Sequence, residues 1–377
     1  MKTLAIIGAS YLQRPLVEKA KEMGLRTICF AWAKDAVCQD IVDVFYPISI
    51  IEKERILTIC RQEHINGICT IASDVAAPTV AYVAEAMGLV GNSYESAQRA
   101  NNKHLMRQAF AQSNVPSPMF YCCTKEETID CLPNFSFPLI VKPSDRSGSL
   151  AVSKVNNEED LKEAISQAKS VSFKHEAMVE EFVEGREISV EFISYQGKHY
   201  PLQITDKETT EAPHFVELAH HQPSSLSSEM YQKVYAVTKQ ALNALGITNG
   251  ASHSEYKIDN EGRIVVMEIG ARMGGDFIGS DLVQLSTGYD FLRGVIEVAL
   301  GEFTTPKITS HNASGVYFLC QPTKQRILPL MQESLTHPER HPEIVAVYLL
   351  NNVLKDPTTS SERSGYIIYQ SKQKLSL

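Results

Sequence analysis

Three absences narrow what this 377-residue chain can do. Its formal net charge is -8, so it has no surplus of lysine and arginine to neutralise nucleic-acid phosphates. Apolar runs are short, and none approaches the roughly 18 residues that a bilayer-spanning helix needs. We therefore expect neither nucleic acid nor membrane among its partners.

The third absence is a cysteine framework. Eight cysteines are spread along the chain, at 29, 38, 60, 69, 122, 123, 131 and 320, and no CxxC pair occurs among them. Such dispersion is typical of buried thiols in a reducing compartment. The apolar run after Met1 is too short for a secretion signal, so we expect a cytoplasmic protein.

The first 100 residues also lack the GxGxxG fingerprint of dinucleotide-binding folds, although they alternate between strand and helix patterns. The turn after the first strand holds one glycine, Gly8, and is expected to be scaffold. Asp74 follows a strand predicted at 67–72 and precedes a helix predicted at 78–87. It is placed either to meet a ligand at the sheet edge or to cap that helix.

The most informative stretch, 264–276, reads IVVMEIGARMGGD. Its apolar start predicts a buried strand, with Glu268 at the mouth of that strand and Arg272 four residues later. A charge in that position is costly to desolvate without a partner or a metal. A salt bridge that caps the strand and a cation and phosphate site both fit this pattern. Gly274 and Gly275 would let a ligand approach the backbone closely.

The strand predicted at 252–258 is joined to this stretch by a turn at 259–262. Pairing around the turn brings Glu255 within a rung or so of Glu268. Two carboxylates that close repel each other unless a cation lies between them, and Mg²⁺ prefers such oxygen ligands. A bulge would shift the register by one residue and could send the two acids to opposite faces.

A second anion-binding pattern lies upstream. Lys142 ends a short buried strand at 137–143, and a small polar loop at 144–149 separates it from the next strand. This predicts a hairpin whose backbone N–H groups fold over phosphates within reach of the lysine. A helix is predicted over 97–112.

Residues 205–226 read as a long irregular segment, of the kind that is functional or disordered. The segment contains the adjacent pair His220 and His221. Neighbouring side chains point to opposite sides of an extended chain, so this pair alone is not expected to chelate a metal.

Together these motifs resemble the ATP-grasp superfamily of ligases, from residue 1 to about 310. The resemblance rests on motifs in the family's order and rough spacing, namely Asn102-Lys103, Val141-Lys142-Pro143, the loop at 144–149, Glu180-Glu181-Phe182-Val183, Glu187, Glu255 and Glu268.

The resemblance implies an α/β fold whose later lobes are of the α+β kind. A Rossmann-like pre-ATP-grasp domain would span 1–100 and an ATP-grasp domain 101–312. The latter would divide into a small flap lobe at about 114–185 and a larger catalytic lobe at about 186–312. A small strand-containing C-terminal subdomain would occupy 313–377.

The resemblance also implies roles for particular residues. The groups implied to bind ATP through its phosphates, adenine or ribose are Lys103, Lys142, Ser147, Gly148, Ser149, Glu180, Val183 and Glu187. The metal, Mg²⁺ or Mn²⁺, would be bound by Glu255 and Glu268. Catalysis would involve Arg272, Glu268 and Lys142, with the arginine neutralising an acyl phosphate. The residues implied to lie near the substrates are Arg272, Gly274, Gly275, Asp74, Lys207 and His220.

Two features depart from the family pattern. Position 270, where the family usually has asparagine, is Gly270. The phosphate loop holds a single glycine, with Asp145 and Arg146 inside it. Gly270 implies that one metal ion is held more weakly or is completed by water or substrate.

The resemblance implies an ATP-dependent, ADP-forming ligase that joins a small-molecule carboxylate to an amine through an acyl phosphate. The sequence is most similar to the amino-acid ligase and carbamoyl-phosphate-synthase-like branch. One alternative is an enzyme acting on carbamate, bicarbonate or a formyl group, as in carbamoyl-phosphate or purine synthesis. Another is a nucleotide-binding regulatory protein without catalysis. The oligomeric state is open, with a homodimer the commonest case.

Overall fold

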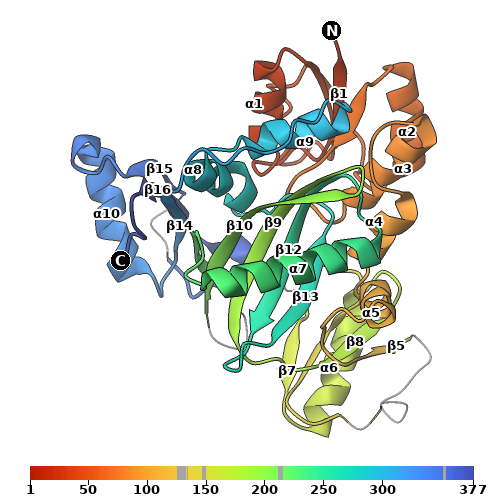
Figure 1. The fold of residues 1–377 in the computed structure, drawn as a ribbon, viewed down its shortest axis with the longest axis vertical. Helices are drawn as coiled ribbons and strands as arrows, with labels where there is room; N and C mark the ends of the chain where they lie inside the picture. The colour runs from red at the N-terminus through yellow and green to blue at the C-terminus, as the bar shows by residue number, and fades with distance from the viewer. Residues whose placement is uncertain (125–132, 134, 147–149, 211–214, 351–353) are drawn as a thin grey trace.

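The computed structural model describes residues 1–124, 133, 135–146, 150–210, 215–350 and 354–377. Figure 1 shows an N-terminal sheet at one end of the long axis, a small sheet at the other, and a long sheet between them. None of the helices in these ranges is long and apolar enough to cross a membrane. The mixed architecture confirms the expected α/β class.

The N-terminal unit is a parallel sheet in the order β3-β2-β1-β4. Its strands are β1 (Thr3–Ile7), β2 (Arg26–Ala31), β3 (Val44–Pro47) and β4 (Gly67–Cys69). Its helices are α1 (Arg14–Glu22), α2 (Lys53–Gln62) and α3 (Ala77–Met87). All five residues of β1 are buried, which agrees with an apolar central strand covered on both faces.

The helix predicted over 97–112 is two helices, α4 (Tyr94–Asn101) and α5 (Lys103–Gln112). Asn102 separates them because its backbone is extended and its side chain accepts a hydrogen bond from the Leu105 N–H, which caps α5. The single-helix prediction is therefore wrong at this point. The break makes Lys103 the first residue of α5.

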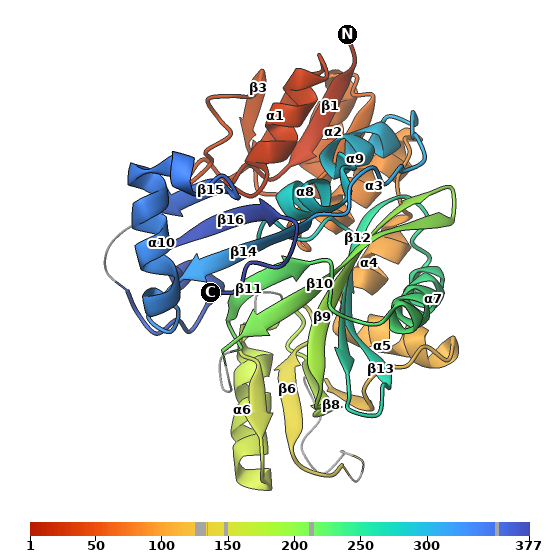
Figure 2. The same cartoon turned by 60° about the vertical axis from the view of Figure 1, so that its left-hand side comes forward.

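The flap lobe is an antiparallel sheet in the order β5-β8-β6-β7, with α6 (Glu158–Val171) packed against it (Figure 2). Its strands are β5 (Phe120–Cys123), β6 (Leu139–Pro143), β7 (Ser153–Val155) and β8 (Ala177–Glu181). The pairing of β6 with β7 agrees with the predicted hairpin. Ser147, Gly148 and Ser149 lie outside the described residues.

The long sheet has the order β13-β12-β9-β10-β11-β14-β16-β15. Its first five strands are β9 (Arg186–Tyr195), β10 (Lys198–Thr209), β11 (Glu217–Gln222), β12 (Gly250–Ile258) and β13 (Ile264–Gly270). The accompanying helices are α7 (Ser228–Leu245), η2 (Ile278–Leu282), α8 (Val283–Thr287) and α9 (Phe291–Ala299).

The prediction of an irregular segment at 205–226 is wrong. Much of it belongs to β10 and β11, which pair with each other. Polar and charged side chains interrupt the apolar alternation of both strands, so the period-2 signal is lost.

The C-terminal segment completes the same sheet, because β14 pairs with β11. Its elements are β14 (Ala313–Leu319), α10 (Lys324–Thr336), η3 (Pro338–Arg340), β15 (Ile344–Leu349), η4 (Ser360–Glu362) and β16 (Gly365–Ser371). The predicted C-terminal strands are present, but they share a sheet with the expected catalytic lobe. The domain limits themselves stay a prediction.

Candidate active site

A cavity of about 430 Å³ lies where the N-terminal unit, the flap lobe and the long sheet meet. Most of the residues singled out from the sequence line it, namely Asp74, Lys103, Lys142, Val183, Glu187, Lys207, His220, Glu255, Glu268, Arg272 and Gly275. Glu180 and Gly274 are not among the residues that line it. The cavity therefore gathers residues from distant parts of the chain, from Leu12 to Ser360.

The acidic pair sits on adjacent strands, with Glu255 directly opposite Glu268. A bulge is present, but it falls between Glu255 and Tyr256 and leaves both carboxylates on the cavity. This confirms the predicted proximity. Each acid has its own lysine: Lys207 Nζ lies 2.8 Å from Glu255 Oε1, and Lys103 Nζ lies 2.9 Å from Glu268 Oε1.

Lys103 is directed into the cavity by its place at the start of α5. Its ammonium also donates to the carbonyl of Arg146, at 2.8 Å, on the loop that follows β6. Burial disfavours its charge, yet the carboxylate of Glu268 outweighs burial and raises the pKa of Lys103. It remains a cation and links α5, the flap lobe and the acidic pair.

Lys142 belongs to a buried ion triad that the sequence did not suggest. Its Nζ lies 2.6 Å from Glu180 Oε2, and Arg107 Nε lies 2.8 Å from Glu180 Oε1. Burial lowers the pKa of Lys142, against the pull of Glu180. Burial would raise the pKa of Glu180, but Arg107 and Lys142 lower it to about 2. Glu180 is thus a fixed anion that holds Lys142 at the cavity wall, and its contact with adenine stays a prediction.

The flap side of the cavity is largely apolar. Ile140, Phe182 and Val183 line it, and Met267 and Glu187 of the long sheet line the cavity as well. The Glu187 carboxylate is 2.8 Å from Lys207 Nζ. An apolar wall beside one carboxylate suits an aromatic ring joined to a hydroxylated sugar.

Arg272 and Asp74 form a two-point ion pair between the long sheet and the N-terminal unit. Arg272 Nε and Nη2 donate to the two oxygens of Asp74 at 2.8 and 2.7 Å. Helix α3 has no side-chain cap, so the cap alternative for Asp74 is wrong. Asp74 lines the cavity, and its contact with a ligand stays a prediction. A Cβ placed on Gly270 would lie 2.6 Å from Asp74 Oδ1. Glycine at 270 therefore leaves room for this ion pair.

Gly274 serves a second buried pair, which involves Glu191 and His253. The Gly274 N–H donates to Glu191 Oε2 at 3.0 Å, and the other oxygen of Glu191 bonds His253 Nδ1. Burial disfavours a charged imidazole, but the carboxylate of Glu191 prevails and raises the pKa of His253 to about 9. A Cβ on Gly274 would lie 2.6 Å from Glu191 Oε1, so only glycine fits. The cationic ring lines the cavity beside Glu255.

The C-terminal segment, which sequence reasoning did not connect to the site, reaches the cavity through Ser360. Arg363 donates to both oxygens of Asp276 at 2.8 and 2.7 Å, and His220 Nε2 lies 3.6 Å from the same carboxylate. Glu217 lies beside Ser360 and also lines the cavity. No sequence signal links Arg363 to Asp276, because they are 87 residues apart and meet only through sheet pairing.

Comparison with known proteins agrees with this geometry. A family model described as the ATP-grasp domain matches residues 135–281. Alanine–anticapsin ligase of Bacillus subtilis strain 168 is 29% identical over 263 residues, which cover 62% of this chain and 55% of that protein. The chain thus spans about half the length of the curated relatives it matches.

Solved structures extend the likeness to the whole fold. An L-amino acid ligase from Bacillus licheniformis superposes with a TM-score of 0.81 at 25% identity, covering 99% of this chain and 94% of that one. A phosphoribosylglycinamide synthetase from Anaerococcus prevotii gives 0.76 at 21% identity, with 99% and 94% covered. The chain therefore carries an ATP-grasp domain over residues 135–281, and its fold as a whole is similar to these two enzymes.

Proposed function

We propose that this protein is an ATP- and Mg²⁺-dependent carboxylate–amine ligase that forms an amide bond, with amino acids as substrates. The observation that carries the proposal is the convergence of Lys103, Lys142, Glu255, Glu268 and Arg272 on one cavity. Similarity to alanine–anticapsin ligase and to an L-amino acid ligase supports the substrate class.

The nucleotide would lie between the flap lobe and the long sheet. The apolar wall at Phe182 and Val183 would receive the adenine, and Glu187 would bind the ribose hydroxyls. Lys103 and Lys142 would hold the phosphates, since both lysines line the cavity. ATP supplies the phosphoryl group that turns the substrate carboxylate into an acyl phosphate, whose phosphate the amine then displaces.

The acidic pair suits a magnesium ion. Two carboxylates on paired residues offer the oxygen ligands that Mg²⁺ prefers, and the cavity leaves its other positions to phosphate or water. Glu255 and Glu268 would hold the ion, which neutralises phosphate charge when bound. Burial would raise the pKa of Glu255, but Lys207 lowers it well below its usual value, so this carboxylate is ionised, as a metal ligand must be.

Arg272 would stabilise the negative charge that develops as the amine attacks. A planar guanidinium contacts carboxylate or phosphate oxygens at two points, and Asp74 fixes its orientation from behind. His220 and Lys207 would lie beside the acceptor, near Gly275. The work of these side chains is orientation and charge neutralisation, without a covalent protein intermediate.

A phosphate-release screen over pairs of amino acids tests the proposal. We expect phosphate to form only when ATP, a divalent cation and two particular amino acids are present together. Lys142→Ala should abolish this signal, whereas Lys162→Ala, on the exposed face of α6, should leave it unchanged. Phosphate release at the same rate with and without an added amine would contradict a carboxylate–amine ligase.

A purine-synthesis type of enzyme is the second candidate, favoured by the likeness to phosphoribosylglycinamide synthetase across the fold. It would use a phosphorylated amine or a one-carbon acid such as bicarbonate or formate in place of two amino acids. The same screen, run with those compounds, separates the two. A signal with them and none with amino acids would favour this candidate.

A further inference from the structure

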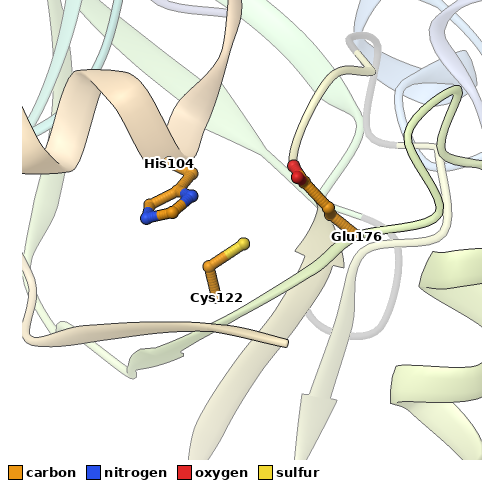
Figure 3. A group of neighbouring side chains, drawn as sticks. All are labelled: His104, Cys122 and Glu176. Atoms are coloured by element: carbon orange, nitrogen blue, oxygen red, sulfur yellow. The ribbon is translucent and has the colours of Figure 1, made fainter. Parts of the chain in front are cut away.

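Three side chains of types that can bind a metal gather where α5 meets the flap lobe, outside the residues that line the cavity. They are His104 on α5, Cys122 on β5 and Glu176, which directly precedes β8. Their ligand atoms all lie within 4.8 Å of one another. Figure 3 shows the thiol of Cys122 pointing between the imidazole and the carboxylate.

We propose that these three side chains bind a zinc ion, with water in the fourth position. Imidazole nitrogen, thiolate sulfur and carboxylate oxygen are all zinc ligands, with bonds of about 2.0–2.3 Å. Ligand atoms around a tetrahedral ion are then roughly 3.5 Å apart. The three ligand atoms must therefore move closer to one another by only about 1 Å. Rotation about side-chain bonds supplies such a movement.

The carboxylate of this group is already oriented by its surroundings. Glu176 Oε2 accepts a hydrogen bond from Ser144 Oγ at 2.8 Å, which leaves its other oxygen for an ion. Ser144 is in turn fixed, since its carbonyl accepts from the Lys103 N–H at 2.7 Å. Partners of this kind orient metal ligands and raise affinity.

The thiolate distinguishes this ion from the one proposed in the cavity. Cys122 is a soft ligand that favours Zn²⁺ over Mg²⁺, whereas Glu255 and Glu268 offer only oxygen. Binding would release the thiol proton to solvent, because the thiolate is the ligand. Zinc at the flap and magnesium in the cavity therefore should not compete.

At this position the ion would connect separate elements of the fold. It would join α5 to β5 and to the residue before β8, close to Lys103 on α5 and to β6, which carries Lys142. A metal bridge between elements remote in sequence stabilises the folded state relative to the unfolded chain. We expect zinc to raise the thermal midpoint of the protein.

Zinc titration of the full chain, reduced and freed of metals with a chelator, tests the site. We expect one zinc ion per chain with an affinity tighter than micromolar, proton release on binding, and no displacement by excess Mg²⁺. Cobalt as a probe should give the absorption band of a thiolate-to-metal charge transfer. This test uses neither nucleotide nor substrate, so it stands apart from any test of the ligase activity.

Variants decide whether these residues hold the ion. Cys122→Ser should remove the charge-transfer band, and His104→Ala and Glu176→Gln should each weaken zinc binding at least about tenfold. His175→Ala, an exposed neighbour of Glu176, should bind zinc like the unaltered protein. Because Cys122 is buried, the half-buried His104 provides the variant less prone to misfolding. Absence of tight zinc binding, or binding that His104→Ala and Glu176→Gln leave unchanged, would overturn the proposal.

Discussion

Glu255 and Glu268 face each other on paired strands, and each carboxylate is held by a lysine from a different part of the chain. Lys207 comes from β10 of the same sheet, whereas Lys103 comes from α5. Two carboxyl groups this close are tolerated because each lies beside a lysine. The pair thus joins the proposed metal site to the proposed phosphate site.

Replacing one member of the pair should stop the reaction. Glu268→Gln removes a proposed metal ligand and the partner of Lys103, so we expect ADP release to fall by about 10²-fold or more. The Mg²⁺ concentration that gives the half-maximal rate should also rise. The rate of ADP release, measured against Mg²⁺ concentration, checks both effects. Glu261→Gln, on the exposed turn of the same hairpin, is the control and should behave like the unaltered protein.

Nucleotide affinity should depend on the protonation of Lys142. Burial lowers the pKa of this lysine below its usual 10.5, so it loses its charge at a lower pH than an ordinary lysine. The charged form binds phosphate, and affinity should therefore fall as pH rises through the lowered pKa. Lys142→Arg keeps the charge, because an arginine stays protonated across this range, and should flatten the fall. Calorimetric titration with ADP from about pH 7 to pH 9.5 measures it. An unaltered protein whose affinity stays constant would contradict this role.

The ion pair between Asp74 and Arg272 should require glycine at position 270. Gly270→Asn places atoms where Asp74 Oδ1 lies, so the buried pair must separate. Breaking such a pair costs about 3–5 kcal/mol, and part of this should appear as a lower free energy of unfolding. In an Asp74→Ala background the same substitution should cost much less. Denaturant unfolding of the four proteins completes this cycle, and equal costs in both backgrounds would show that the pair is not the reason.

The C-terminal segment should contribute to substrate binding. Arg363→Ala removes the guanidinium group that donates hydrogen bonds to both carboxylate oxygens of Asp276, a residue that lines the cavity. We expect the KM for one substrate to rise roughly tenfold, as for loss of a charged hydrogen bond, while the affinity for ADP stays the same. Arg340→Ala, exposed in the same segment, serves as the control. A change in ADP affinity instead would place Arg363 with the nucleotide.

Local patterns in the sequence were enough for much of the fold and the site. The short turn between the two strands predicts that Glu255 lies opposite Glu268. The position of Asp74 directly after a parallel strand predicts its location at the sheet edge, where the cavity lies. The end of β10, from residue 205 onward, and the whole of β11 were missed because cavity-facing polar residues such as Lys207 and His220 break their alternation.

Contacts between distant parts of the chain were not accessible in the same way. The burial of Glu180 between Arg107 and Lys142 depends on how α5 packs against the flap sheet. The pairing of Arg363 with Asp276 depends on β14 joining β11. Neither contact has a local signature, since each is set by tertiary packing.

The formation of an acyl phosphate is the central claim, and isotope transfer tests it most directly. The reaction is run with ATP, the amine and a substrate whose carboxylate carries ¹⁸O, and the inorganic phosphate is analysed by mass. A carboxylate that attacks the γ-phosphate gives up one of its oxygens when the amine displaces phosphate. We therefore predict one ¹⁸O atom in each phosphate released. Phosphate without the label, formed together with the amide product, would contradict the account.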